Sequence, residues 1–96
     1  MGSPNMWYKD CLEYFVFYSS NEKDHKNIEK MSITELEAYV LEKRTQISEK
    51  DFYYLAGMSA HVVADESCKC GCDAMNAAAC GISDFESFID IDYTWL

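Results

Sequence analysis

The sequence predicts a mainly α-helical fold, in which a small domain has a central antiparallel helix hairpin, a cysteine-rich loop and an extended C-terminal segment. Three segments begin with a capping box, in which a serine and an acidic residue three positions later bond each other's backbone amides. After two of these starts, apolar residues recur at helical spacing. Apolar residues make up 49% of the chain and aromatic residues 15%, so a packed core within one domain is expected.

Residues 1–5 are expected to be an expression scar, which leaves residues 6–96 as a single compact domain. The segment 6–18 is expected to be a helix, because Lys9, Asp10 and Glu13 fall within about 100° of one another on a helical wheel. The residues on the rest of the wheel are expected to be buried, and Cys11 among them is expected to be a small hydrophobic residue of the core. Residues 19–30 are predominantly polar and are expected to form an exposed loop or a frayed turn.

The run from Tyr14 to Tyr18 also suits a β-strand, because its residues are aromatic and β-branched. Near the other end of the chain, residues 89–95 alternate apolar and polar, which is the period of a strand. The alternative fold is therefore an α+β domain with its N- and C-terminal strands paired. If the first run is helical, the C-terminal residues form an extended segment laid on the helical body.

Two helices are expected in the middle of the chain. The capping box of Ser32 and Glu35 begins a helix over residues 33–44, and that of Ser48 and Asp51 begins a helix over residues 49–64. Only residues 45–47 separate the two, so they are expected to form an antiparallel hairpin. Their inward faces are predicted to carry Ile33, Leu36, Tyr39 and Val40 in the first helix, and Phe52, Leu55, Ala56, Ser59, Val62 and Val63 in the second.

The last third of the chain has two further helix-start signals. Asp73 is expected to N-cap a short helix through residues 74–79. Ser83 and Glu86 form the third capping box.

Four of the five cysteines, Cys68, Cys70, Cys72 and Cys80, lie within thirteen residues. Clustered thiolates favour zinc or copper(I), and Gly71 allows the backbone to curl so that the first three thiols converge. The predicted cofactor is therefore structural zinc, with copper(I) as the alternative.

A structural zinc ion normally takes four ligands, and there are two candidates for the fourth. One is His61, which stands seven residues before Cys68. The other is Cys80, which joins only if the alanine run before it is not helical or if Cys72 is left out of the site. Along a helix, Cys80 would lie about 12 Å from Cys72.

The formal net charge of −9 is concentrated in the second half of the chain. Residues up to Ser48 include six basic and eight acidic side chains, whereas those from Glu49 onward include two basic and nine acidic ones. Such a surface repels nucleic acid and anionic membranes, and it speeds association with a basic protein surface.

No catalytic signature accompanies the cysteines: the chain has no phosphate-binding glycine loop, no G-x-S-x-G and no H-E-x-x-H. An odd number of cysteines and the lack of a signal-peptide pattern favour a cytoplasmic protein. The expected function is a small acidic, non-enzymatic, inhibitor-like protein-binding module with a structural zinc site. The alternatives are a thiol-based copper(I) or redox protein, and a precursor whose cysteine-rich residues 68–96 are released or modified by another enzyme.

Overall fold

The computed structural model describes residues 4–20 and 24–90, and of Pro4, Asn5 and Cys70 it describes the backbone only. The described residues form five helices and no strand, so the mainly α prediction is confirmed. The helices are α1 (Pro4–Ser19), α2 (His25–Glu29), α3 (Ile33–Gln46), α4 (Glu49–Cys70) and α5 (Cys72–Ile89).

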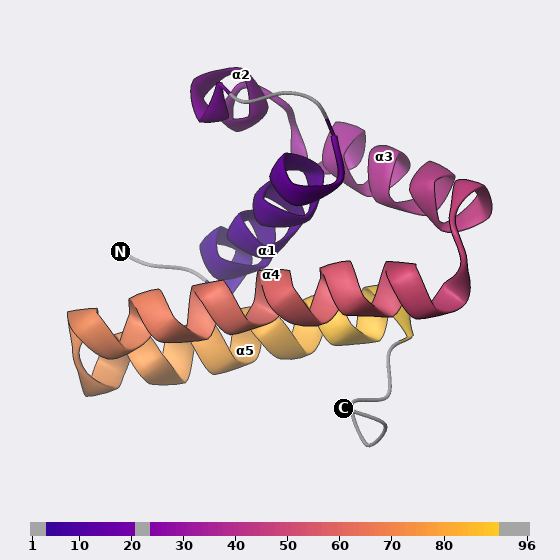
Figure 1. The fold of residues 1–96 in the computed structure, drawn as a ribbon. Helices are drawn as coiled ribbons and strands as arrows, with labels where there is room; N and C mark the ends of the chain where they lie inside the picture. The colour runs from indigo at the N-terminus through magenta and orange to yellow at the C-terminus, as the bar shows by residue number, and fades with distance from the viewer. Residues whose placement is uncertain (1–3, 21–23, 91–96) are drawn as a thin grey trace.

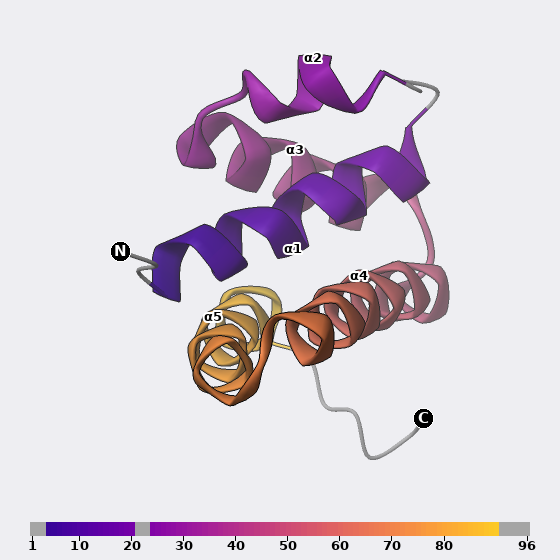
Figure 2. The same cartoon turned by 90° about the vertical axis from the view of Figure 1, so that its left-hand side faces the viewer.

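Helix α1 lies in the middle of the molecule and contacts the other four helices. Figure 2 shows α4 and α5 side by side below it and α2 and α3 above it. Because α1 is covered on both sides, Cys11, Leu12 and Phe15 are fully buried, and the Phe15 ring lies 5.2 Å from the Phe52 ring. The prediction that Cys11 is a buried small hydrophobe is confirmed.

The central position of α1 also decides two points left open by its sequence. Tyr14–Tyr18 is helical, so the alternative of a strand in this run is wrong. The charged face is not left to solvent, because Glu13 is buried and Asp10 is half-buried. Packing on both sides of α1 leaves too little exposed circumference for a polar stripe.

A short helix replaces part of the loop expected over residues 19–30. The side chain of Asp24 accepts a hydrogen bond from the amide of Lys26 at 3.0 Å and caps α2. Ile28 is buried with 1% of its surface exposed, and it anchors α2 to the core. A single apolar residue in a polar segment was too weak a signal to predict this helix.

The helices expected in the middle of the chain are present as α3 and α4. Both bonds of the first capping box form, at 3.0 Å from the Ser32 amide to Glu35 and 3.2 Å from the Glu35 amide to Ser32. Ser48 likewise accepts a bond from the Asp51 amide at 3.1 Å. Of the expected inward faces, Leu36, Val40, Phe52, Ala56, Ser59 and Val63 are fully buried.

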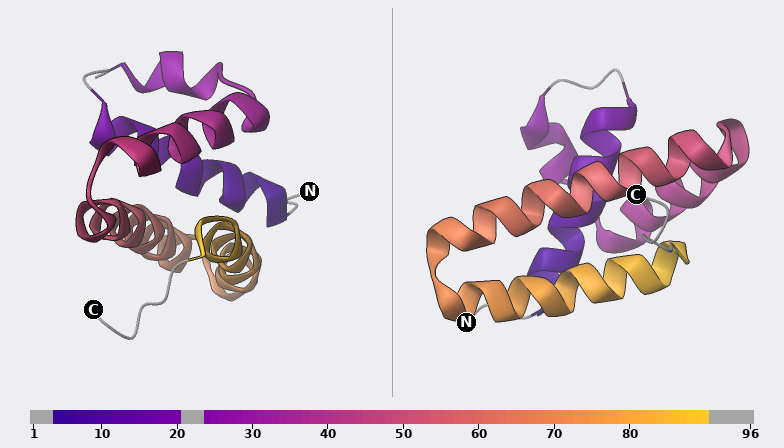
Figure 3. Two further views of the ribbon diagram at one scale, coloured as in Figure 1. Left: turned by 90° about the vertical axis from the view of Figure 1, so that its right-hand side faces the viewer. Right: turned by 60° about the horizontal axis from the view of Figure 1, so that its bottom comes forward.

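The antiparallel hairpin expected between residues 33–44 and 49–64 is not confirmed. Helix α3 packs on α1, whereas α4 packs on α5 and α1. The antiparallel pair is α4 and α5, which run alongside each other over most of their length (Figure 1 and the right panel of Figure 3).

The expected cysteine-rich loop is wrong, because the cysteines lie in helices. Helix α4 runs six residues beyond the predicted end and includes Cys68 and Cys70, while Cys72 is the first residue of α5. Gly71 alone breaks the helix, with φ of 110° and ψ of 178°. Ser67, in the extended part of α4, is buried with 3% of its surface exposed, so packing holds this part of the helix in place.

Helix α5 continues through the third capping box, so Ser83 is not a helix start. A buried face of Ala78, Gly81, Phe85 and Ile89 crosses that position at helical spacing. Because these residues pack against the core, the capping-box pattern of Ser83 and Glu86 does not begin a new helix.

The C-terminal end of α5 is bound to the junction of α3 and α4. Arg44 donates a hydrogen bond to the Ile89 carbonyl at 2.6 Å, and the Tyr53 hydroxyl donates to the Asp90 carbonyl at 3.3 Å. Ile89 was expected in a strand, but it is the last residue of α5. Residues 91–96 of the expected extended segment lie outside the described residues.

Candidate functional site

The tip of the α4–α5 hairpin carries the cysteine cluster. Cys68 lies in the last turn of α4 and Cys72 begins α5, with Gly71 between the two helices. Figure 1 shows that this end of the hairpin extends past α1. Cys68 and Cys72 are exposed and free, and no described atom beyond Gly71 and its two chain neighbours lies within 4 Å of the place where a Cβ on Gly71 would stand. The tip is therefore open to solvent.

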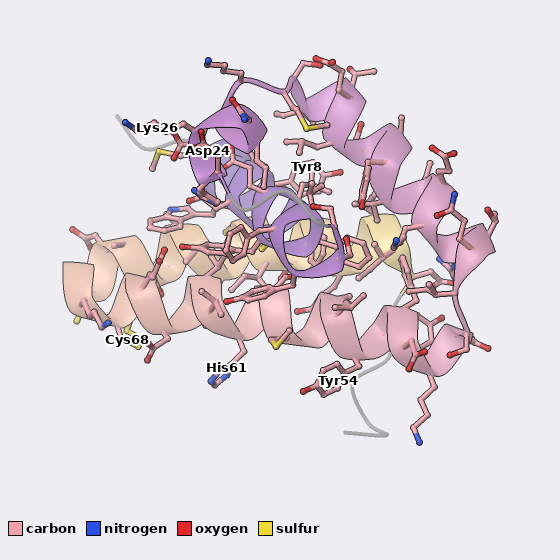
Figure 4. The ribbon with its side chains drawn as sticks, turned by 45° about the horizontal axis from the view of Figure 1, so that its top comes forward. Tyr8, Asp24, Lys26, Tyr54, His61 and Cys68 are labelled. Atoms are coloured by element: carbon pink, nitrogen blue, oxygen red, sulfur yellow. The ribbon has the colours of Figure 1, made fainter. Side chains whose placement is uncertain are left out.

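His61 is exposed on α4, on the same side of the helix as Cys68 (Figure 4). The two residues are seven positions apart, which is roughly 10 Å along a helix. A ligand of the same zinc ion must lie within about 4 Å of the Cys68 sulfur. The structure therefore does not bring His61 to the cysteine cluster.

Cys80 is exposed on α5, eight positions after Cys72. The alanine run between them is helical, so the two cysteines lie about 12 Å apart along one helix. The condition under which Cys80 could join Cys72 at one ion is not met. Among the side chains that the structure describes, no three or more His, Cys, Asp or Glu residues are placed to hold a metal ion.

The α4–α5 hairpin is strongly acidic. Residues 49–90 include eight acidic and two basic side chains, a formal charge of −6. The ion pair described on this hairpin joins Lys69 to Asp65 at 3.8 Å, with both side chains largely exposed. An exposed pair of this kind contributes less than about 1 kcal/mol. The net negative charge of residues 49–90 favours the approach of a cation or a basic surface.

An exposed tyrosine lies beside a groove at the other end of the hairpin. Tyr54 is 61% exposed, whereas the neighbouring Tyr53 bonds Arg44 and is half-buried. The groove has a volume of about 340 Å³ and is lined by Tyr18, Ser19, Lys43, Ile47, Asp51, Tyr54 and Leu55. Aromatic side chains at such places commonly anchor protein partners.

A cluster of acidic groups around α1 was missed by sequence reasoning. Burial, followed by the nearby Glu13 and Glu66, raises the pKa of Asp10 to about 6. Burial also raises the pKa of Glu13, although Lys9 lies 3.5 Å away and opposes this. No local pattern marks these acids, because their burial depends on helices distant in the sequence.

The cluster extends to α2 and α4 through an aromatic side chain. The Tyr14 hydroxyl donates a hydrogen bond to Glu66, and the Tyr14 ring lies 5.4 Å from the His25 ring. His25 Nδ1 is 3.4 Å from Glu29 Oε1. The cluster thus joins α1, α2 and α4.

Within the described parts of the chain, none of the helices combines the length and the apolar character needed to cross a bilayer. No family model, curated protein or solved structure matches this chain.

Proposed function

We propose that this chain is a small, non-enzymatic protein-binding module that docks on a basic surface of another protein, in the manner of an acidic inhibitor. The observation that supports this best is the charge of −6 over residues 49–90, which form the α4–α5 hairpin and its C-cap Asp90. A concentrated charge of one sign steers a partner of the opposite sign and raises its association rate.

Tyr54 is the proposed anchor of this contact. It is the most exposed of the large hydrophobic side chains among the described residues, and the groove beside it can accept an apolar side chain of the partner. Asp65 lies eleven positions after Tyr54 on α4, a spacing that returns to the same side of a helix. The proposed surface thus combines an aromatic centre with an acidic flank.

Zinc binding stays a prediction, because the geometry leaves the three tip cysteines without a fourth ligand from His61 or Cys80. A cytoplasmic location also stays a proposal, and exposed thiols suit a reducing compartment. Zinc analysis and thermal unfolding with and without a chelator test the first of these.

The docking proposal is tested with two charge-matched variants, Asp65→Lys on the hairpin and Glu42→Lys on α3. Each changes the net charge by the same amount, near the C-terminal end of an exposed helix where lysine is tolerated. Partners captured from cells of the source organism are identified, purified and titrated against each form at low and high salt.

We expect Asp65→Lys to weaken binding several-fold at low salt and the parent to lose affinity as salt increases. Glu42→Lys is expected to bind like the parent. Equal effects of the two variants, or binding that does not depend on salt, would contradict docking through the hairpin.

A further inference from the structure

The short helix α2 packs on one side of α1, away from the proposed docking surface. Lys9, Glu13 and Phe17 stand four positions apart along α1, a spacing that places them on one side of the helix. Lys9 donates a hydrogen bond to the Glu29 carbonyl, at the end of α2, at 3.2 Å. The Phe17 ring lies 5.7 Å from the ring of His25, at the start of α2. Helix α2 therefore covers the part of α1 between these two contacts, which includes Glu13 (Figure 2).

Glu13 is a carboxyl group that the fold keeps from water. Only 6% of its surface is exposed, and burial raises its pKa above the ordinary value of 4.5. Glu29 of α2 adds to this effect, whereas Lys9 and His25 oppose it. The folded chain therefore prefers the neutral acid. This contribution to stability is present in acid and is lost as the pH rises above the ordinary value and through the raised one.

The acids around Glu13 add to its effect as the pH rises. Asp10, one turn earlier on α1, has a pKa raised to about 6 by burial, by Glu13 and by Glu66 of α4. Lys9 and His25 are the basic groups that oppose these acids, and His25 Nδ1 lies 3.4 Å from Glu29 Oε1. Negative charge thus accumulates between α1, α2 and α4 on going from acid to neutral pH.

We infer that α2 is a pH-sensitive flap, which is docked over Glu13 in acid and is released more often at neutral pH. An ionised carboxylate is costly to bury, and release of α2 returns it to water. Helix α2 has only five residues, which is too short for a helix to be stable by itself. Its buried apolar anchor is Ile28, so a modest electrostatic cost is sufficient to shift the balance.

Release of α2 would also change an apolar pocket between the first three helices. The pocket has a volume of about 210 Å³ and is lined by Val16, Ser20, Asn27, Ile28, Met31 and Tyr39. Because α2 provides part of its wall, the flap controls how far the apolar surface of α1 and α3 is open to solvent.

The test is amide hydrogen exchange of the full chain, followed by NMR between about pH 4 and about pH 7 and corrected for the intrinsic exchange rates. The amides of Asn27 and Met31 report on α2, because they donate to the Asp24 and Ile28 carbonyls at 3.0 Å. We expect their protection to fall by about threefold or more as the pH rises. The midpoint of this fall is expected to match the titration of the Glu13 carboxyl carbon in the same sample.

Two variants with matched chemistry separate Glu13 from the other buried acids. Glu13→Gln keeps the neutral form that burial favours, and the protection of α2 is expected to stay nearly constant with pH. Glu86→Gln removes another acid whose pKa is raised by burial, on α5 and across α1 from α2. This control is expected to behave like the parent.

Several results would overturn the inference. The parental fall in Glu13→Gln, or its loss in Glu86→Gln, would mean that another group controls α2. A midpoint that follows the His25 imidazole and not the Glu13 carboxyl would assign the effect to His25. An equal fall at the Phe85 and Ile89 amides of α5, also removed by Glu13→Gln, would mean that ionisation acts on the whole fold.

Discussion

Asp10 is a half-buried carboxyl group on the central helix, surrounded by other acids. Glu13 and Glu66 add to the effect of burial, while Lys9 and His25 partly oppose it, and the pKa of Asp10 rises to about 6. Since the ordinary value is 3.8, the folded chain holds this proton more tightly than the unfolded chain. Its contribution to stability is therefore greatest in acid and is lost as the pH rises from about 4 to about 6.

Replacing Asp10 with Asn is expected to stabilise the protein at pH 7. The full pKa shift corresponds to about 3 kcal/mol, and partial exposure reduces the expected gain to about 1 kcal/mol. Urea unfolding between pH 4 and pH 7 measures this effect, and the gain should disappear toward pH 4. Asp73→Asn, at an exposed position on α5, is the control. A variant that is less stable than the parent at pH 7 would contradict the assignment.

At the scale of elements, the hairpin depends on one residue. Gly71 has φ of 110° and ψ of 178°, a conformation that residues with a side chain rarely adopt. Gly71→Ala is expected to lower the free energy of unfolding by about 1–3 kcal/mol, although nothing lies near the added methyl group.

Chemical denaturation measures this loss, with Lys69→Ala as the control in the preceding turn. That change removes only an exposed ion pair and should cost no more than about 0.5 kcal/mol. If the two variants lose the same stability, the backbone of Gly71 does not limit the turn.

Helix starts could be predicted where local bonds decide them. Ser32 and Ser48 begin helices as predicted, because their caps need only the next three residues. Ser83 has the same pattern but lies inside α5, where burial of Phe85 and Ile89 against distant helices decides the outcome. The C-terminal end of α4 could not be predicted either, because it also depends on packing against distant helices.

The candidate site could be predicted in part. Sequence spacing is sufficient to place Cys68, Cys70 and Cys72 at one end of the hairpin, because they are nearly consecutive. Whether His61 or Cys80 joins them depends on how far α4 and α5 extend as helices, which tertiary packing decides. The burial of Asp10 likewise follows from the central position of α1.

The molecule as a whole is organised around α1. Phe15 is fully buried and packs on Phe52 of α4, within a single core cluster to which all five helices contribute. Phe15→Ala is expected to cost about 3–5 kcal/mol. A domain of this size has a typical stability of about 5–15 kcal/mol, so the variant should lose a large part of its stability and melt well below the parent.

Thermal unfolding followed by circular dichroism tests this expectation. Met75→Ala, at a position that is 46% exposed on α5, is the matched control and should melt close to the parent. A loss of helix confined to α1 would show that the core is not one cooperative unit.

The core also weighs against the hypothesis that residues 68–96 are released as a separate peptide. Phe85 and Ile89 are fully buried, and α5 packs against both α1 and α4. Removing this segment would expose the apolar faces of the helices that remain.

The pairing of α1 with α5 has a consequence for biosynthesis. Helix α1 is synthesised before α5 and packs against it, so residues that cover α1 are still to be made while α2, α3 and α4 leave the ribosome. During that interval Leu12 and Phe15 have no partner from α5, and the nascent chain exposes an apolar surface that is prone to aggregation. The core around α1 therefore closes only after α5 has been synthesised.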